Sequence, residues 1–159
     1  PSLRKGDPLF LDTNTVVYAM GRSAAAPSST QRLEAACRRL VEAIGREELH
    51  AVTSLVVLQE LIYLFARWQR ARQGPAVPQI RRVVGDVIAL CQAVFTPTLA
   101  ELQQALALYT PSRHDFNDLL IAQAMASHGV RHIVTADKGF DRVRGITRVE
   151  PEALAKQLG

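Results

Sequence analysis

Short apolar runs alternate along the chain with longer stretches in which apolar residues recur every three or four positions. Short runs rich in β-branched residues predict strands, and spacings of three and four predict helices with one buried face. Because helical stretches separate successive strands, the pattern predicts an α/β fold with a parallel sheet. The predicted strands are Leu9–Leu11, Ala51–Thr53, Ala93–Thr96, His132–Thr135 and Thr147–Val149.

Polar residues, prolines and glycines mark where the predicted helices begin and end. Ser28–Thr30 would cap a helix that runs to Ile44 and stops at Gly45. Ser54 would cap the next helix, from Leu55 to about Arg72, and the Pro- and Gly-rich segment 73–78 predicts a surface loop. The remaining predicted helices are Gln79–Gln92, Leu99–Leu108, and one that starts at Ser112 or Asp115 and ends before Gly129.

The two helices on either side of segment 73–78 allow two arrangements. They would form either a projecting arm, of the kind that often contacts partners, or a pair that covers one face of the sheet. The apolar positions between Leu61 and Trp68 exceed what one small sheet face needs. We therefore expect self-association, most simply as a two-fold homodimer.

Length and composition indicate a single domain that spans residues 1–159. Apolar residues make up 48% of the chain, which argues against disorder. No apolar stretch is long enough to span a bilayer, and we expect neither a signal peptide nor membrane association. The two cysteines, Cys37 and Cys91, are expected to be free, buried thiols of a cytoplasmic protein.

Four acidic residues stand where a parallel sheet collects functional groups. Asp12 directly follows one predicted strand, and Asp137 lies two residues after the end of another. Glu60 lies inside an apolar helix, roughly two turns after a strand end, and Asp118 lies in the first turn of another helix. Converging carboxylates would repel one another by roughly 4 kcal/mol per pair at about 4 Å. A divalent cation is the usual remedy, so these four acids are candidate metal ligands.

Several polar residues beside the four acids are candidates for supporting roles. Asn14 would orient a water or a neighbouring carboxylate, and Thr135 offers a hydroxyl beside the strand-end acid. Asp115 is expected to cap a helix and Asp141 to pair with an arginine, while Glu101 is expected to be a surface acid. Taken singly, each of the four acids also has an ordinary structural interpretation, as a turn, a cap or a solvated helix edge.

The charge balance favours a polyanionic partner. The chain carries a formal charge of +4 although it contains 15 acidic residues, and its pI is about 9.5. An acidic site within a basic surface suits a phosphodiester that is held by cations at the edges and cut at a metal. Charge alone fits a generic basic protein equally well.

Four motifs, taken in order along the chain, resemble the PIN-domain ribonucleases. The resemblance covers nearly the whole chain, and its length and compactness are similar to those of the VapC-type toxins of toxin–antitoxin pairs. The matching segments are Leu9-Phe10-Leu11-Asp12-Thr13-Asn14, Thr53-Ser54-Leu55-Val56-Val57-Leu58-Gln59-Glu60-Leu61, Phe116-Asn117-Asp118-Leu119-Leu120-Ile121-Ala122-Gln123-Ala124 and Ile133-Val134-Thr135-Ala136-Asp137-Lys138-Gly139-Phe140.

The resemblance implies a fold, an activity and a set of site residues. The implied fold is a three-layer sandwich with a central parallel sheet of about five strands flanked by helices. The implied activity is Mg²⁺- or Mn²⁺-dependent hydrolysis of RNA, and a toxin would also have a small antitoxin protein as partner. Asp12, Glu60, Asp118 and Asp137 match the family's acidic quartet, and Asn14 and Thr135 match its auxiliary polar positions. The chain departs from the family pattern at Gly139, where members often carry another acid that Asp141 could partly replace.

Three alternatives to a toxin remain open. One is a stand-alone PIN nuclease in RNA processing, and another is a non-catalytic metal- or RNA-binding regulatory module. A phosphatase with an aspartyl nucleophile would need a second acid where Asn14 stands. No histidine pairs with a Ser or Cys in a nucleophile motif, so metal-bound hydroxide is the expected nucleophile.

Overall fold

The computed structural model describes residues 3–4, 6–21, 26–71 and 77–158, and these form an α/β fold around one sheet. All strand pairs are parallel, and the strand order is β3-β2-β1-β4-β5. All five predicted strands are present, each within one residue of its expected ends. They are β1 (Pro8–Leu11), β2 (His50–Ser54), β3 (Ala93–Phe95), β4 (His132–Val134) and β5 (Thr147–Val149).

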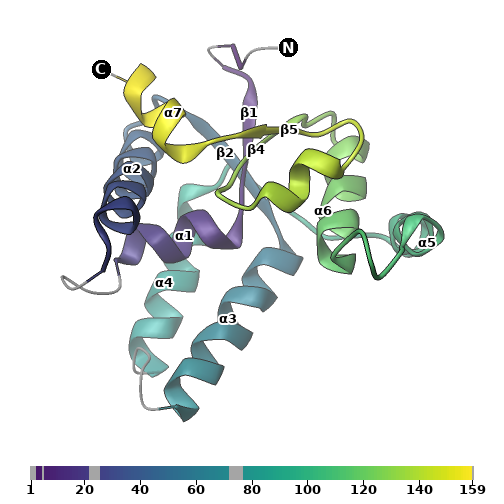
Figure 1. The fold of residues 1–159 in the computed structure, drawn as a ribbon, viewed down its shortest axis with the longest axis horizontal. Helices are drawn as coiled ribbons and strands as arrows, with labels where there is room; N and C mark the ends of the chain where they lie inside the picture. The colour runs from purple at the N-terminus through teal and green to yellow at the C-terminus, as the bar shows by residue number, and fades with distance from the viewer. Residues whose placement is uncertain (1–2, 5, 22–25, 72–76, 159) are drawn as a thin grey trace.

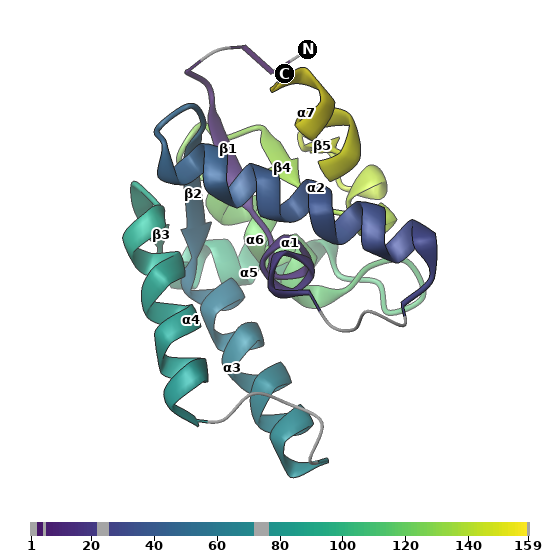
Figure 2. The same ribbon diagram turned by 90° about the vertical axis from the view of Figure 1, so that its left-hand side faces the viewer.

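Helices cover both faces of the sheet, which confirms the expected three-layer sandwich. In Figure 1 the helices α1, α2 and α7 lie on one side of the strands and α5 and α6 on the other. Figure 2, turned by 90°, shows α1 and α2 in front of the sheet. The helices are α1 (Thr13–Met20), α2 (Ser28–Gly45), α3 (Leu55–Arg70), α4 (Val77–Leu90), α5 (Leu99–Leu108), α6 (Phe116–Ser127) and α7 (Pro151–Gln157), with a 3₁₀ helix η1 (Lys138–Arg142) after β4.

The central strand β1 is buried on both faces. Leu9, Phe10 and Leu11 are each at most 1% exposed. A strand covered by helices on both sides needs a continuous apolar run instead of alternation, which explains the sequence of β1. Asp12 follows at once, so the carboxylate emerges in the middle of the sheet, between the ends of β2 and β4.

The helices α3 and α4 project together beyond the sheet in both views (Figures 1 and 2). This arrangement is the arm, rather than a pair lying flat on the sheet. Within Leu61–Trp68, the side chains of Leu61 and Phe65 are fully buried and form the inner face of α3. Ile62 and Tyr63 in the same stretch are 48% and 65% exposed, as expected of an arm with more apolar surface than the sheet covers.

Several helix ends differ from the prediction. The helix α1 was not predicted, because Asp12-Thr13-Asn14 resembles a turn at a strand end. The helix α2 begins at Ser28, after Pro27, and no side chain caps it, so the predicted cap was wrong. The same helix includes Gly45, which was expected to lie just beyond its end. Residues 73–76 of the predicted loop lie outside the described residues, and the last two residues of that loop, 77 and 78, open α4.

Two helix caps are polar contacts that the sequence only partly indicated. Asp115, not Ser112, caps α6, and its Oδ1 accepts a hydrogen bond from the backbone N–H of Asn117 at 2.8 Å. Glu101 is 5% exposed and forms a capping box with Thr98 at the start of α5. Glu101 is therefore a buried structural acid, and its expected place on the surface was wrong.

Cys37 and Cys91 are free and buried, as expected. Burial raises the pKa of each thiol to about 12, so both stay protonated and unreactive at neutral pH. None of the described helices is both long and apolar enough to cross a membrane.

Adjacent residues of α3 test the assignment of the core. Leu61→Ala should lower the free energy of unfolding by about 2–5 kcal/mol, because Leu61 is fully buried and its removal leaves a cavity. Ile62→Ala removes a similar volume from a side chain that is 48% exposed, and should cost less than about 1 kcal/mol. Urea unfolding of the two variants measures the difference. Equal losses would contradict the orientation of α3.

Candidate active site

Three of the four predicted acids lie after the neighbouring strands β1, β2 and β4, and the fourth, Asp118, lies on α6. Asp12 follows β1 directly, Glu60 lies on α3 after β2, and Asp137 follows β4. From β1 the chain crosses first to β2 on one side and later reaches β4 on the other. Sites of open α/β sheets form at the carboxyl ends of strands where the strand order reverses in this way.

Asp12 is held in place by buried hydrogen bonds. Its side chain is 4% exposed, and Thr135 Oγ1 donates a hydrogen bond to its Oδ2 at 2.6 Å. Burial raises the pKa of Asp12 to about 6, and the nearby charge of Glu60 adds to this effect. The Thr135 hydroxyl and the backbone amides of Thr13 and Asn14 act against it by stabilising the carboxylate.

Glu60 is held by two side chains that sequence reasoning missed. Thr13 Oγ1 donates a hydrogen bond to Glu60 Oε2 at 2.5 Å, and Asn117 Nδ2 donates one to Oε1 at 2.7 Å. Both partners are sequence neighbours of predicted ligands, since Thr13 follows Asp12 and Asn117 precedes Asp118. That adjacency was the available signal. Asn14, the predicted auxiliary residue, is half-buried on α1 and its side chain bonds to no other described residue.

Asp118 has the most perturbed carboxyl of the site. Burial raises its pKa to about 7, and the charges of Asp115, Asp137, Asp12 and Glu60 raise it further, in that order. All the predicted acids are therefore close enough to Asp118 to act on it electrostatically. Asp115 contributes to the site in this way in addition to capping α6.

Gly139 leaves room between two of the acids. A Cβ placed on Gly139 would lie 3.1 Å from Asp118 Oδ2 and 3.1 Å from Asp137 Oδ1, so these two oxygens flank the same small space. A larger side chain at this position would press on both carboxylates.

The residues after β4 are fixed by a chain of hydrogen bonds. Asp137 caps η1 by accepting from the backbone N–H of Gly139 at 2.7 Å, and its own N–H donates to Thr135 Oγ1 at 3.0 Å. Thr135 therefore links the backbone of Asp137 to the carboxylate of Asp12. Asp141 pairs with an arginine, as expected: its Oδ1 lies 2.7 Å from Nε of Arg148. The carboxylate of Asp141 is therefore paired with a residue of β5.

The chemistry of the donor set suits a hard divalent cation. Asp12, Glu60, Asp118 and Asp137 offer only carboxylate oxygens, which are typical ligands of Mg²⁺ and Mn²⁺. Within the described residues, however, no three His, Cys, Asp or Glu side chains are gathered closely enough to hold an ion. The carboxylates thus surround one region without forming a closed cage, and binding an ion would draw them inward.

Comparison with known proteins gives consistent results over most of the chain. The sequence model of the PIN domain matches residues 9–146. The chain is 28% identical over 147 residues to Ribonuclease VapC7 of Mycobacterium tuberculosis, a match that covers 91% of this chain and 92% of the relative.

Two solved structures share the fold. VapC20 of Mycobacterium tuberculosis, described as a Sarcin-Ricin loop cleaving toxin, matches with a TM-score of 0.57 and 19% identity over 86% of this chain and 95% of its own. The protein PAE2754 of Pyrobaculum aerophilum matches with a TM-score of 0.60 and 18% identity over 96% of both chains. With the family match over residues 9–146 and the site at the expected edge of the sheet, the chain belongs to the PIN domain family.

Proposed function

We propose that the protein is a divalent-metal-dependent endoribonuclease that acts as the toxin of a toxin–antitoxin pair. The observation that carries this proposal is the convergence of Asp12, Glu60, Asp118 and Asp137 at the carboxyl edge of the sheet, where each lies close enough to raise the pKa of Asp118 or is Asp118 itself. A basic chain that gathers so many carboxylates is suited to bind a cation and, through it, a phosphodiester. The similarity to Ribonuclease VapC7 supports RNA as the substrate. In this proposal residues 1–159 form one cytoplasmic domain, with a small antitoxin protein as its partner.

Asp12, Glu60, Asp118 and Asp137 would hold Mg²⁺ or Mn²⁺. The bound cation would lower the pKa of an attacking water and stabilise charge on the phosphate. Thr135 holds Asp12 in position through its 2.6 Å hydrogen bond, and Thr13 and Asn117 do the same for Glu60. Such supporting contacts orient ligands before the ion arrives. Asp118, with a pKa of about 7 in the metal-free protein, would release its proton when the ion binds.

Three of the four histidines have structural positions, so none of these three is placed to act as a general base at the acidic site. His50 bonds to Gln92, and His128 stacks on Phe95 and bonds to the carbonyl of Ala124. His132 is buried in β4.

Two alternatives are separable by experiment. A stand-alone RNA-processing nuclease would cut RNA but would purify without a small partner, whereas a toxin is expected to co-purify with its antitoxin. A non-catalytic regulatory module would bind RNA or metal without cutting.

Substitution of Asp12 tests catalysis. Asp12→Asn should lower the rate of metal-dependent RNA cleavage by at least about 100-fold, because it removes a charge from the metal site. The fold should persist, since an amide oxygen can still accept from Thr135. Cleavage of a labelled single-stranded RNA with Mg²⁺ or Mn²⁺ measures the rate. The matched control is Asp86→Asn on α4, whose side chain is 64% exposed and which, among the described residues, pairs only with Arg82 at the surface. Equal rates for the two variants would refute the acidic site.

The titration of Asp118 predicts how stability depends on pH and metal. The folded-state pKa of Asp118 is about 7 and that of Asp12 about 6, both raised from 3.8. The folded protein therefore holds more protons than the unfolded chain above pH 3.8, and its stability falls as pH rises towards 7. Without metal, the melting temperature should be lower at pH 8 than at pH 5. Asp118→Asn should reduce this loss, because an amide does not ionise.

Metal should reverse the loss at pH 8. Mn²⁺ at about ten times its dissociation constant should stabilise the protein by roughly 1.4 kcal/mol, which raises the melting temperature by roughly 3–6 °C. Asp118→Asn should shrink this shift, and Asp86→Asn should keep it. Melting curves of the three proteins at pH 5 and pH 8, with and without Mn²⁺, test both effects. If Asp118→Asn retains the full shift, Asp118 is not a ligand.

We also propose that the protein forms a homodimer through α5. Leu99, Leu102 and Leu106 follow one face of this helix and are 71%, 40% and 59% exposed. A stable dimer should bury more than about 1,000 Å². Sedimentation should show a dimer that Leu106→Glu converts to a monomer, whereas Tyr63→Glu on α3 should leave it intact. A strictly monomeric parent protein at high concentration would contradict the dimer.

A further inference from the structure

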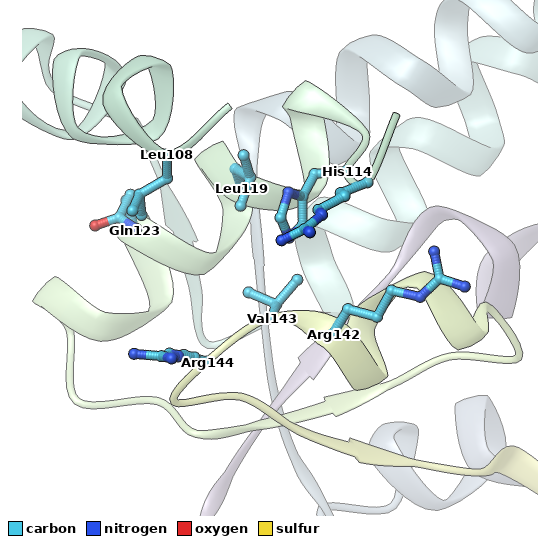
Figure 3. Close-up of a pocket in the computed structure, with 8 residues that line it drawn as sticks. Leu108, His114, Leu119, Gln123, Arg142, Val143 and Arg144 are labelled. Atoms are coloured by element: carbon cyan, nitrogen blue, oxygen red, sulfur yellow. The ribbon is translucent and has the colours of Figure 1, made fainter. Parts of the chain in front are cut away.

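A pocket of about 610 Å³ lies beside the acidic site and contains none of its four predicted metal ligands. Its walls come from the end of α5, the segment that leads into α6, one side of α6, and residues 142–144 at and just after the end of η1. Figure 3 shows His114 and Leu119 above Val143, with Arg142 and Arg144 on opposite sides.

The pocket and the acidic site share two structural elements. The helix α6 carries Asp118 in the acidic site and, at the next position, Leu119 in the pocket. The helix η1 begins directly after Asp137 and ends at Arg142, another pocket residue. Five residues of 3₁₀ helix span about 10 Å. The pocket therefore lies within the reach of one or two nucleotides from the acids.

The pocket is positively charged and its cations are unpaired. Arg113, Arg142 and Arg144 line it, and none of its lining residues is acidic. Among the described residues, no carboxylate forms an ion pair with any of the three. Arg148 differs, because it bonds to both Asp141 and Glu150. The acids near β5 thus neutralise Arg148 and leave the pocket arginines available to an external anion.

His114 adds an unused polar group to the same wall. Its ring lines the pocket (Figure 3), and its Nδ1 is buried with no hydrogen-bond partner among the described residues. Buried polar atoms nearly always have a partner, and exceptions occur where a ligand or an ion completes the bonding. This nitrogen is therefore a polar atom in the pocket wall to which no described residue bonds.

The remaining lining residues suit the rest of a nucleotide. Leu108, Leu119 and Val143 provide an apolar surface beside the guanidinium groups, and Gln123 provides an amide. Single-stranded RNA is recognised by contacts of this kind, in which bases lie on flat or apolar groups while cations hold the phosphates. A volume of about 610 Å³ is within the usual range for a small-ligand site.

We propose that this pocket is a subsite for one nucleotide of the RNA strand, adjacent to the bond that is cut. Arg142 and Arg144 hold the phosphates on either side of it, and the apolar wall formed by Leu108, Leu119 and Val143 receives its ribose or base. The proposal rests on the proposed nuclease function. A nucleotide is favoured over an acidic peptide because the pocket shares α6 and η1 with the acidic site, so a strand positioned for cleavage passes directly over it.

RNA binding in a non-cleaving background tests the subsite. Asp12→Asn protein is titrated with a fluorescent single-stranded RNA in Mg²⁺ at several salt concentrations, alone and with Arg142→Ala or Arg144→Ala added. Each arginine variant should weaken binding about five- to tenfold and reduce the slope of log K against log[salt] by about 0.7, the value for one lost phosphate contact. The control is Arg81→Ala, an exposed arginine on α4 that removes the same charge.

In the cleaving protein, the same substitutions separate positioning from chemistry. Arg142→Ala and Arg144→Ala should raise KM for RNA about five- to tenfold with kcat nearly unchanged. Arg142→Lys should recover part of the affinity, because it restores the charge without the planar guanidinium. All variants should melt within a few degrees of the parent, since both arginines are exposed.

The outcomes distinguish the subsite from the nuclease. If the parent cuts RNA but the pocket variants bind it as Arg81→Ala does, the subsite is wrong and the nuclease stands. If the variants lose binding to a co-purifying protein partner while RNA affinity is unchanged, the pocket is a protein-docking site and the subsite is again wrong. If the protein with an intact pocket neither binds nor cuts RNA, both proposals fail.

Discussion

The burial of carboxylates, together with the repulsion among them, is the constraint on which the functional edge of this protein depends. Asp12 is almost completely buried, and its pKa and that of Asp118 are raised towards neutrality. A fold optimised for stability alone would place a salt bridge or an apolar residue at the end of its central strand. Strain of this kind is typical of functional sites, where the free energy lost in the empty protein is recovered on ligand binding.

The hydrogen bonds around the acids show how the fold bears this repulsion. Thr135, directly after the neighbouring strand β4, donates to Asp12, while Thr13 and Asn117 donate to opposite oxygens of Glu60. Each bond orients a carboxylate without neutralising its charge, since all three donors are uncharged. An arginine or lysine in these places would stabilise the empty protein more strongly but would compete with a cation. The choice of Thr and Asn therefore keeps the site anionic and available.

The sequence predicted the sheet and the acids because both depend on local patterns. Apolar runs marked all five strands, and the positions of Asp12 and Asp137 after two of them placed the site. The hydrogen bonds that hold the Glu60 carboxylate could not be predicted, because their donors lie 47 and 57 residues away in sequence and meet Glu60 only in the folded chain. The helix α1 was missed for a related reason, since Asp12-Thr13-Asn14 is compatible with a turn until Val16 and Val17 are buried in the core.

The charged residues next to the acidic site are also arranged so that some are paired and others are left for a ligand. Asp141 in η1 and Glu150 after β5 both pair with Arg148, which also donates to the carbonyl of Thr135 at 3.3 Å. This arrangement ties β5 to the segment that carries Asp137 and removes two acids from the neighbourhood of Arg142 and Arg144. One cation is thus used for structure, and the two beside it remain unpaired at the rim of the acidic site. A polyanion approaching this edge meets unpaired positive charge within about 10 Å of the carboxylates, a separation set by the length of η1.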